Sequence, residues 1–186
     1  MRKLLMTCGV VGLAFVASCN TTSAEAQAEP EKMTAASLTE LIQKFDEEAK
    51  VEGNAVQFTL QERGLIFVYD ETADRMRVIT PIAPAAVATD ALMARMLQAN
   101  YDAVLDARYA VANDLIWAVY IHKLSSITQE DFLSGVAQAV TAAETFGTSF
   151  TSGAVVFGGG DSSAIHSDLL EKLEKAAEEA NKGTGI

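Results

Sequence analysis

The sequence predicts an α+β domain in which helices pack on an antiparallel β-sheet, and three observations predict it. Five short segments contain closely spaced apolar residues, several of them alternating with polar ones, which is typical of β-strands. Stretches with helical apolar spacing flank these segments, in the order helix, three strands, helix, two strands, helix. The gaps within each run of strands are short, and short gaps favour antiparallel pairing.

The predicted domain spans residues 34–150. Its first helix is expected to open at a capping box formed by Ser37 and Glu40 and to stop at residues 51–54. Asn113 and Asp114 predict a tight turn between the last two strands, because both residue types tolerate positive φ. The remaining elements are expected as strands at 55–60, 64–69, 75–82, 104–111 and 115–124, and as helices at 86–99 and from Thr128 onward.

The amino terminus, residues 1–18, has the layout of a secretory signal peptide: two basic residues, an apolar stretch and small residues. The apolar stretch is shorter than a permanent membrane-spanning helix needs. Its end, Val16-Ala17-Ser18-Cys19, resembles the bacterial lipobox. The resemblance implies cleavage between Ser18 and Cys19, diacylglycerol on the Cys19 sulfur and an anchor of acyl chains such as palmitate. An ordinary signal peptide with an incidental Cys19 is the alternative.

Composition and charge restrict the partners. The chain has 14 basic and 25 acidic residues, a net charge of −11, and loss of residues 1–18 would lower the charge to −13. Such a polyanion repels nucleic acid, so neutral or basic protein surfaces are the expected partners. Both cysteines lie in the first 20 residues, which leaves none for a disulfide in the body of the protein.

Asn20 follows the lipobox cysteine and favours localisation at the periplasmic face of the outer membrane.

Three segments flank the predicted domain. Residues 19–33 are small, polar and acidic, which predicts a lipidated flexible tether. Residues 151–163 are glycine-rich and predict a linker. Residues 164–182 predict an amphipathic helix with a narrow apolar stripe, and we expect a mobile appendage or a helix that docks weakly or on a partner. The stripe comprises Ile165, Leu169, Leu173, Ala176 and Ala180.

The element order, together with Met96-Leu97-Gln98-Ala99-Asn100 before the last pair of strands, resembles the CesT/Tir-type secretion chaperones and the related YbjN-type proteins. The resemblance covers residues 37–146. It implies a homodimeric, acidic, non-enzymatic protein-binding module without catalytic residues or cofactors. Secretion chaperones of this group work in the cytosol, whereas this chain carries an export signal. The resemblance therefore implies only the fold and the binding of polypeptide for this chain.

By position, the resemblance places a dimer or partner surface on residues 92–99, 104–111 and 115–124. Trp117 and Tyr120 lie on opposite faces of one predicted strand, so one ring is expected in the core and the other at an interface. The methionines remain ambiguous between core and partner groove. The candidate surface residues are Met93, Met96, Tyr109, Trp117 and Tyr120.

Catalytic and metal sites are not expected. His122 and His166 have no second histidine at ligand spacing. A serine–histidine–aspartate catalytic set is also not expected, because the chain lacks the G-x-S-x-G motif of a nucleophile elbow. Its candidate members would be Ser125 or Ser126, His122 and Asp114. The glycines before Ser162 lack the lysine of a phosphate-binding loop. The acidic runs 46–48 and 70–71 lack the spacing of an EF-hand and predict solvated faces.

The sequence therefore predicts a membrane-anchored, non-enzymatic protein-binding module of the bacterial cell envelope. The alternative is a carrier that holds a small hydrophobic ligand or lipid in a cavity between sheet and helices. An enzyme is the least favoured class, because no titratable groups gather around a nucleophile.

Overall fold

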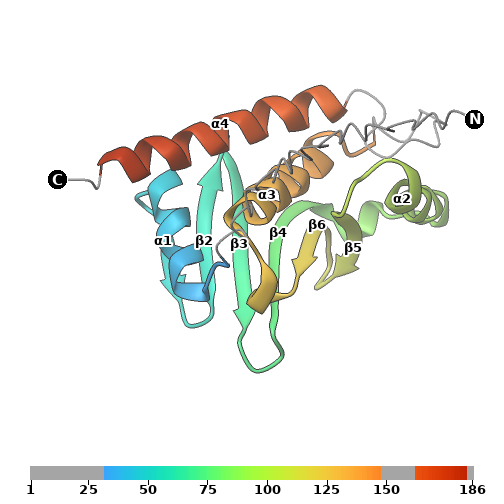
Figure 1. The fold of residues 1–186 in the computed structure, drawn as a ribbon. Helices are drawn as coiled ribbons and strands as arrows, with labels where there is room; N and C mark the ends of the chain where they lie inside the picture. Colours follow the sequence, from blue (N-terminus) through green and yellow to red (C-terminus); the bar gives the residue numbers. More distant parts are fainter. Residues whose placement is uncertain (1–31, 148–161, 184–186) are drawn as a thin grey trace, which may run out of the picture.

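The computed structural model describes residues 32–147 and 162–183. It confirms the predicted α+β class: a six-stranded antiparallel sheet, in the order β1-β2-β3-β4-β6-β5, carries its helices on one face (Figure 1). The strands are β1 (Lys50–Glu52), β2 (Ala55–Leu60), β3 (Arg63–Asp70), β4 (Arg75–Pro84), β5 (Arg108–Ala112) and β6 (Leu115–His122). The helices are α1 (Ala35–Phe45), α2 (Asp90–Asp102), α3 (Gln129–Glu144) and α4 (Ser162–Gly183), with 3-10 turns η1 (Ala85–Val87) and η2 (Leu124–Ser126).

Alternation along the strands decides which side chains meet the helices. Every second residue of β2, β3, β4 and β6 points to the helical face, and these side chains form the core with α1 and α3. Phe67 lies at the centre, 5.5 Å from the ring of Phe132 in an edge-to-face arrangement. The strand residues on this face include Val56, Phe58, Leu65, Phe67, Met76, Val78, Ile116, Ala118 and Tyr120.

The first helix and the first strand differ from the sequence-based expectation. The capping box of α1 pairs Thr34 with Ser37, not Ser37 with Glu40, so the helix begins earlier than expected. The helix ends at Phe45, and residues 50–52 form the edge strand β1. All three residues of β1 are exposed, so no apolar alternation marks this strand in the sequence.

Strand β5 is shorter than expected because α3 holds the residues before it. The Oε1 atom of Gln138 accepts hydrogen bonds from the backbone N–H groups of Asp106 and Ala107, at 2.7 and 3.1 Å. Helix α2 likewise begins later than expected, at its N-cap Thr89, because η1 follows Pro84. The tight turn at Asn113 and Asp114 is confirmed: their φ angles are 49° and 60°.

The carboxy-terminal helix is part of the core, which differs from the expected mobile appendage. Helix α4 packs along α3 and α1 (Figure 1). Leu169, Leu173 and Ala177 are at most 2% exposed and join the cluster that contains Leu38 and Ile42. The acids and lysines of α4 face solvent. Two members of the predicted stripe differ from the expectation: Ile165 is 37% exposed, and Ala177, not Ala176, is the buried alanine. Helices α1, α3 and α4 therefore share one buried cluster with the inward-facing residues of β2, β3 and β4.

Helix α3 lies close against β6 at Gly135. A Cβ atom at this position would overlap the ring of Tyr120, which is 5% exposed. Glycine in a helix interior ordinarily costs about 1 kcal/mol relative to alanine. Here the missing methyl group instead allows the helix to lie on the aromatic ring.

We predict that Gly135→Ala destabilises the protein by about 1–2 kcal/mol, because overpacking outweighs the gain in helix propensity. Urea denaturation followed by circular dichroism measures the change. Gly64→Ala is the matched control, since a Cβ at Gly64 meets no atom within 4 Å and we expect unchanged or higher stability. A Gly135→Ala variant as stable as the wild type contradicts the tight contact.

Candidate functional site

Exposed apolar side chains gather where α2 lies beside the edge strand β5. Met93, Leu97 and Tyr101 follow one another at four-residue spacing on α2, and they are 39%, 71% and 71% exposed. Val111 of β5 is 48% exposed. We call these four residues the α2/β5 surface. A hollow of about 160 Å³ between the helix and the strand is lined by Met93, Leu97, Val111 and the inner neighbours Met96, Asn100, Tyr109 and Ala110.

The free edge of β5 is partly closed by a side chain of α2. The Asn100 carbonyl oxygen accepts a hydrogen bond from the Tyr109 N–H at 2.7 Å, and its amide donates to the Tyr109 carbonyl at 3.1 Å. Both backbone groups of Tyr109 are therefore occupied, so another strand is unable to pair with β5 at this residue. A partner at this edge must instead contact side chains. These two bonds give Asn100, the last residue of the Met96–Asn100 segment, a structural role.

The structure separates the five side chains expected on a partner surface. Met96, Tyr109 and Tyr120 are 4–5% exposed and belong to the core. Met96 and Tyr109 cluster with Ile116 and Ala118, and Tyr120 lies in the cluster that contains Phe67. The Tyr109 hydroxyl donates to the Ala142 carbonyl at 2.8 Å.

Met93 and Trp117 remain accessible. Met93 lies on the α2/β5 surface, and Trp117 lies on the opposite face of the sheet, where its Nε1 donates to the Ala112 carbonyl at 2.8 Å. Leu97 and Val111 fall within the segments predicted to supply a surface but are not among the five residues named for it, and Tyr101 lies outside those segments. For Leu97 and Tyr101 the signal in the sequence is the four-residue spacing from Met93 along α2, whereas no such spacing marks Val111 on β5.

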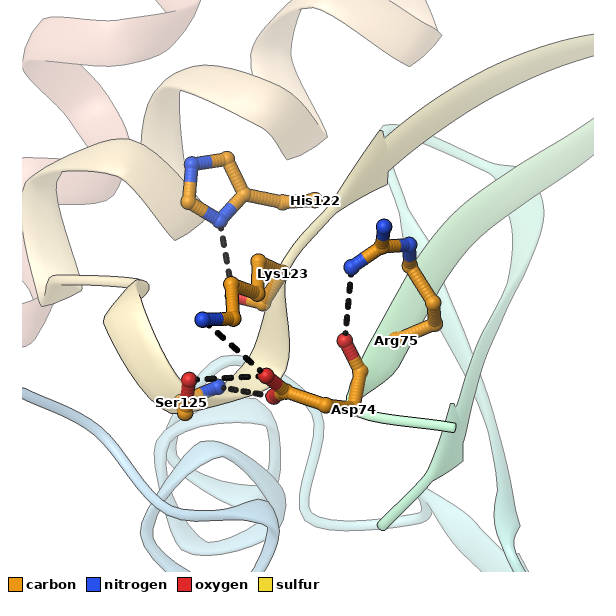
Figure 2. A network of polar contacts seen from close by, with 5 residues as sticks. All are labelled: Asp74, Arg75, His122, Lys123 and Ser125. Atoms are coloured by element: carbon orange, nitrogen blue, oxygen red, sulfur yellow. Dashed lines mark hydrogen bonds and ion pairs between the residues drawn. The ribbon is translucent and has the colours of Figure 1, made fainter. Parts of the chain in front are cut away.

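A polar network surrounds Asp74, in the turn between β3 and β4 (Figure 2). Its carboxylate accepts hydrogen bonds from the N–H and the hydroxyl of Ser125, at 2.7 and 2.9 Å, and pairs with Lys123 at 3.4 Å. The His122 Nδ1 lies 2.9 Å from the Lys123 carbonyl, and Figure 2 draws no bond from this ring to Ser125. The Ser125 hydroxyl is bonded to Asp74, whereas Asp114, the aspartate considered with Ser125 and His122 in the sequence, lies at the opposite end of β6 from His122. The network ties the β3–β4 turn to η2, which precedes α3.

Within residues 32–147 and 162–183, no group of three histidine, cysteine or acidic side chains is placed to hold a metal ion. The acidic runs contain residues that stabilise local structure. Asp46 accepts hydrogen bonds from the N–H groups of Thr59 and Glu48, and Asp70 accepts one from Ala73. Burial lowers the pKa of His166, which favours its neutral form. The same described stretches contain no helix long and apolar enough to cross a bilayer.

The proposed lipidation site and the glycine-rich segment are not placed by the structure. Ser18 and Cys19, the tether up to residue 31 and most of the 151–163 linker lie outside the described residues. Lys32, at the end of the tether, forms an antiparallel bridge with Thr128, and Met33 donates its N–H to the Ile127 carbonyl at 2.8 Å. The chain therefore joins the folded domain at Lys32.

Hydrogen bonds from Ser125, opposed by partial desolvation and assisted by Lys123, lower the pKa of Asp74. A carboxyl group with a lowered pKa contributes stability above its unfolded pKa and loses it as the pH falls through its folded pKa. We therefore predict that Asp74→Asn lowers the urea midpoint at neutral pH and flattens its decline in acid. Asp114→Asn, in the β5–β6 turn, is the control. Identical acid profiles for Asp74→Asn and the wild type contradict the assigned role.

No family model and no curated protein sequence matches the chain. Solved structures that are similar to it in shape include three complexes. The chaperone–effector complex of HopA1 and SchA gives a TM-score of 0.48 at 12% identity over 63% of this chain and 98% of the other. The ExsC–ExsE complex gives 0.47 at 12% identity over 61% and 92%, and the Yersinia pestis type III secretion chaperone SycH with a YscM2 fragment gives 0.43 at 11% over 58% and 98%. At these values the likeness concerns the arrangement of helices and strands alone.

Proposed function

We propose that this chain is a lipid-anchored, non-enzymatic protein-binding module of the bacterial cell envelope that works as a homodimer. The α2/β5 surface carries the proposal. Four large apolar side chains meet there at the edge of the sheet, two of them 71% exposed. Apolar groups gathered in this way are typical of protein interfaces, whereas singly scattered ones are ordinary surface.

A second copy is a suitable occupant of the α2/β5 surface. The exposed residues belong to a helix and an edge strand, so a twofold arrangement places Leu97 and Tyr101 against the same residues of the other copy. Asn100 occupies the backbone of β5 at Tyr109, which favours contact through side chains over strand pairing. The expected dimer therefore buries the apolar surface without extending the sheet.

The lipid anchor rests on the sequence. Val16-Ala17-Ser18-Cys19 supplies the aliphatic residue, the two small residues and the cysteine of a lipobox, and Asn20 favours the periplasmic face of the outer membrane. Acyl chains contribute about 0.8 kcal/mol per buried CH₂, so several chains hold a protein stably without a membrane span. A domain with this net charge gains nothing from anionic headgroups, and its retention depends on the lipid.

The carrier of a hydrophobic ligand is not favoured by the described residues. The side chains between the sheet and α3 are almost fully buried against one another, and they include Phe67, Phe132, Leu133 and Val136. The α2/β5 hollow of about 160 Å³ is smaller than the roughly 300 Å³ at which ligand pockets begin. A larger hollow of about 560 Å³, lined by Gly64, Ile66 and Trp117, lies on the other face of the sheet and not between the sheet and the helices.

We predict a homodimer that Val111→Asp weakens at least 30-fold, since burying an unpaired carboxylate at an interface costs about 2 kcal/mol or more. Size-exclusion chromatography with light scattering measures the dimer. Val51→Asp is a matched control, because Val51 is 49% exposed on β1, the other edge strand. A monomeric wild type, or equal weakening by both variants, contradicts an interface at the α2/β5 surface.

We predict that Cys19→Ala abolishes lipid labelling, because the cysteine sulfur is the only proposed acceptor of diacylglycerol. Cells grown with labelled palmitate show incorporation into the wild-type protein, and fractionation shows it with the outer membrane. Cys8→Ala, within the segment expected to be removed, is the control and retains the label. Equal labelling of wild type and Cys19→Ala would overturn the anchor and leave the dimer untouched.

A further inference from the structure

The face of the sheet opposite the helices carries an apolar band. The second set of alternating residues on β3, β4 and β6 points to this face, and we call its apolar members the open face. Ile66, Ile79 and Val119 stand side by side in one cross-strand row. Ile121 is 53% exposed, and the other members are partly exposed. The open face comprises Ile66, Val68, Ile79, Trp117, Val119 and Ile121.

A hollow of about 560 Å³ adjoins this band where β3 and β4 separate. Their regular pairing ends at Ile66 and Ile79, and Pro81 has no N–H to continue it. The Thr80 hydroxyl bonds the Gly64 carbonyl at 2.9 Å instead. A Cβ at Gly64 would meet no atom within 4 Å, and Trp117 also lines the hollow. The hollow has room for a large side chain beside the indole of Trp117. Asp46, Glu48 and Lys50 line its far end, toward β1, so the carboxylates of a bound segment belong at the arginines described next and not in the hollow.

Arginines stand within and beside the apolar band. Arg77 lies between Val68 and Ile121 in its cross-strand row, and Arg108 lies opposite Val119. The ion pairs formed by the described residues all use lysines, so neither guanidinium has a carboxylate partner in this part of the chain. Arg108 donates to the carbonyls of Leu105 and Ala107 and keeps further N–H groups. These arginines place positive charge beside the apolar band of a chain whose net charge is −11.

We propose that the open face binds an acidic polypeptide segment that places a large apolar side chain in the hollow at Gly64. The proposal deepens the proposed protein-binding function and depends on it. Carboxylates suit the unpaired guanidiniums of Arg77 and Arg108, with which they form bidentate hydrogen bonds. A second copy of this face would bring its own Arg77 and Arg108 against them, so like charges oppose self-association here. The apolar band and the hollow require apolar side chains from the same segment.

Selection of random dodecapeptides displayed on phage, with the purified protein as target, tests the proposal. The enriched peptides are expected to combine Asp or Glu with a large apolar residue. Synthetic versions in which phenylalanine replaces tryptophan should shift the fluorescence of Trp117, the single tryptophan of the chain. Gly64→Val fills the hollow with a residue that suits a strand, and we expect at least tenfold weaker binding with undiminished thermal stability.

The double variant Arg77→Glu with Arg108→Glu should also weaken binding at least tenfold. Lys182→Glu is the charge control, because this side chain is 78% exposed on α4. Enrichment of basic or uncharged peptides, or equal binding to Gly64→Val and to the wild type, overturns the open-face site. Peptides that bind elsewhere overturn the open-face site and still support a protein-binding module. The proposed function is tested separately, by the effect of Val111→Asp on the dimer.

Discussion

The contact between Gly135 and Tyr120 sets the distance between the helix layer and the sheet. Only a residue without a side chain fits over this ring, and α3 can then press against β4, β5 and β6 along its length. The burial that results raises the pKa of Tyr120 to about 12, so its ring stays neutral. Because α3 also holds the Asp106 and Ala107 backbone through Gln138, the same close approach fixes where β5 begins.

The position of α3 also determines what is left for partners. Helices α1, α3 and α4 fill one side of the sheet, and Leu169 and Leu173 of α4 complete that layer. The strands nevertheless carry apolar residues on both faces, as Ile66 and Phe67 show on adjacent positions of β3. A sheet with one covered face usually alternates apolar with polar residues. The second apolar set is the observation that supports the proposed binding at the open face.

Sequence patterns predicted the elements whose apolar residues repeat, and they failed where hydrogen bonds decide the structure. The limits of β2 follow from the alternation of Val56 and Phe58, and α3 begins directly after Thr128 as its cap predicts. Strand β1 has no buried residue, so no apolar pattern in the sequence indicates it. Strand β5 is shortened by Gln138, which lies about 30 positions further along the chain. Local patterns do not contain such long-range bonds.

The candidate surfaces were harder to predict than the fold, because one strand or helix serves two environments. Along β6, Tyr120 and Trp117 differ only in the face they occupy, and the sequence gives no sign of which face the helices cover. On α2, Met96 packs inward while Met93 and Leu97 point out, so apolar character alone does not separate core from interface. Deciding between them requires the direction from which α3 approaches.

The two surfaces lie in different directions, and this separation has a consequence for binding. A dimer joined at the α2/β5 edge leaves both open faces accessible, since Ile66, Ile79 and Val119 point away from the helices. Each dimer then offers two copies of the same site. A partner with two acidic segments binds the second site as an intramolecular event, which strengthens binding without any new contact. A membrane anchor on each copy would raise the local concentration further, so modest affinity at one open face is sufficient for the module to retain a partner.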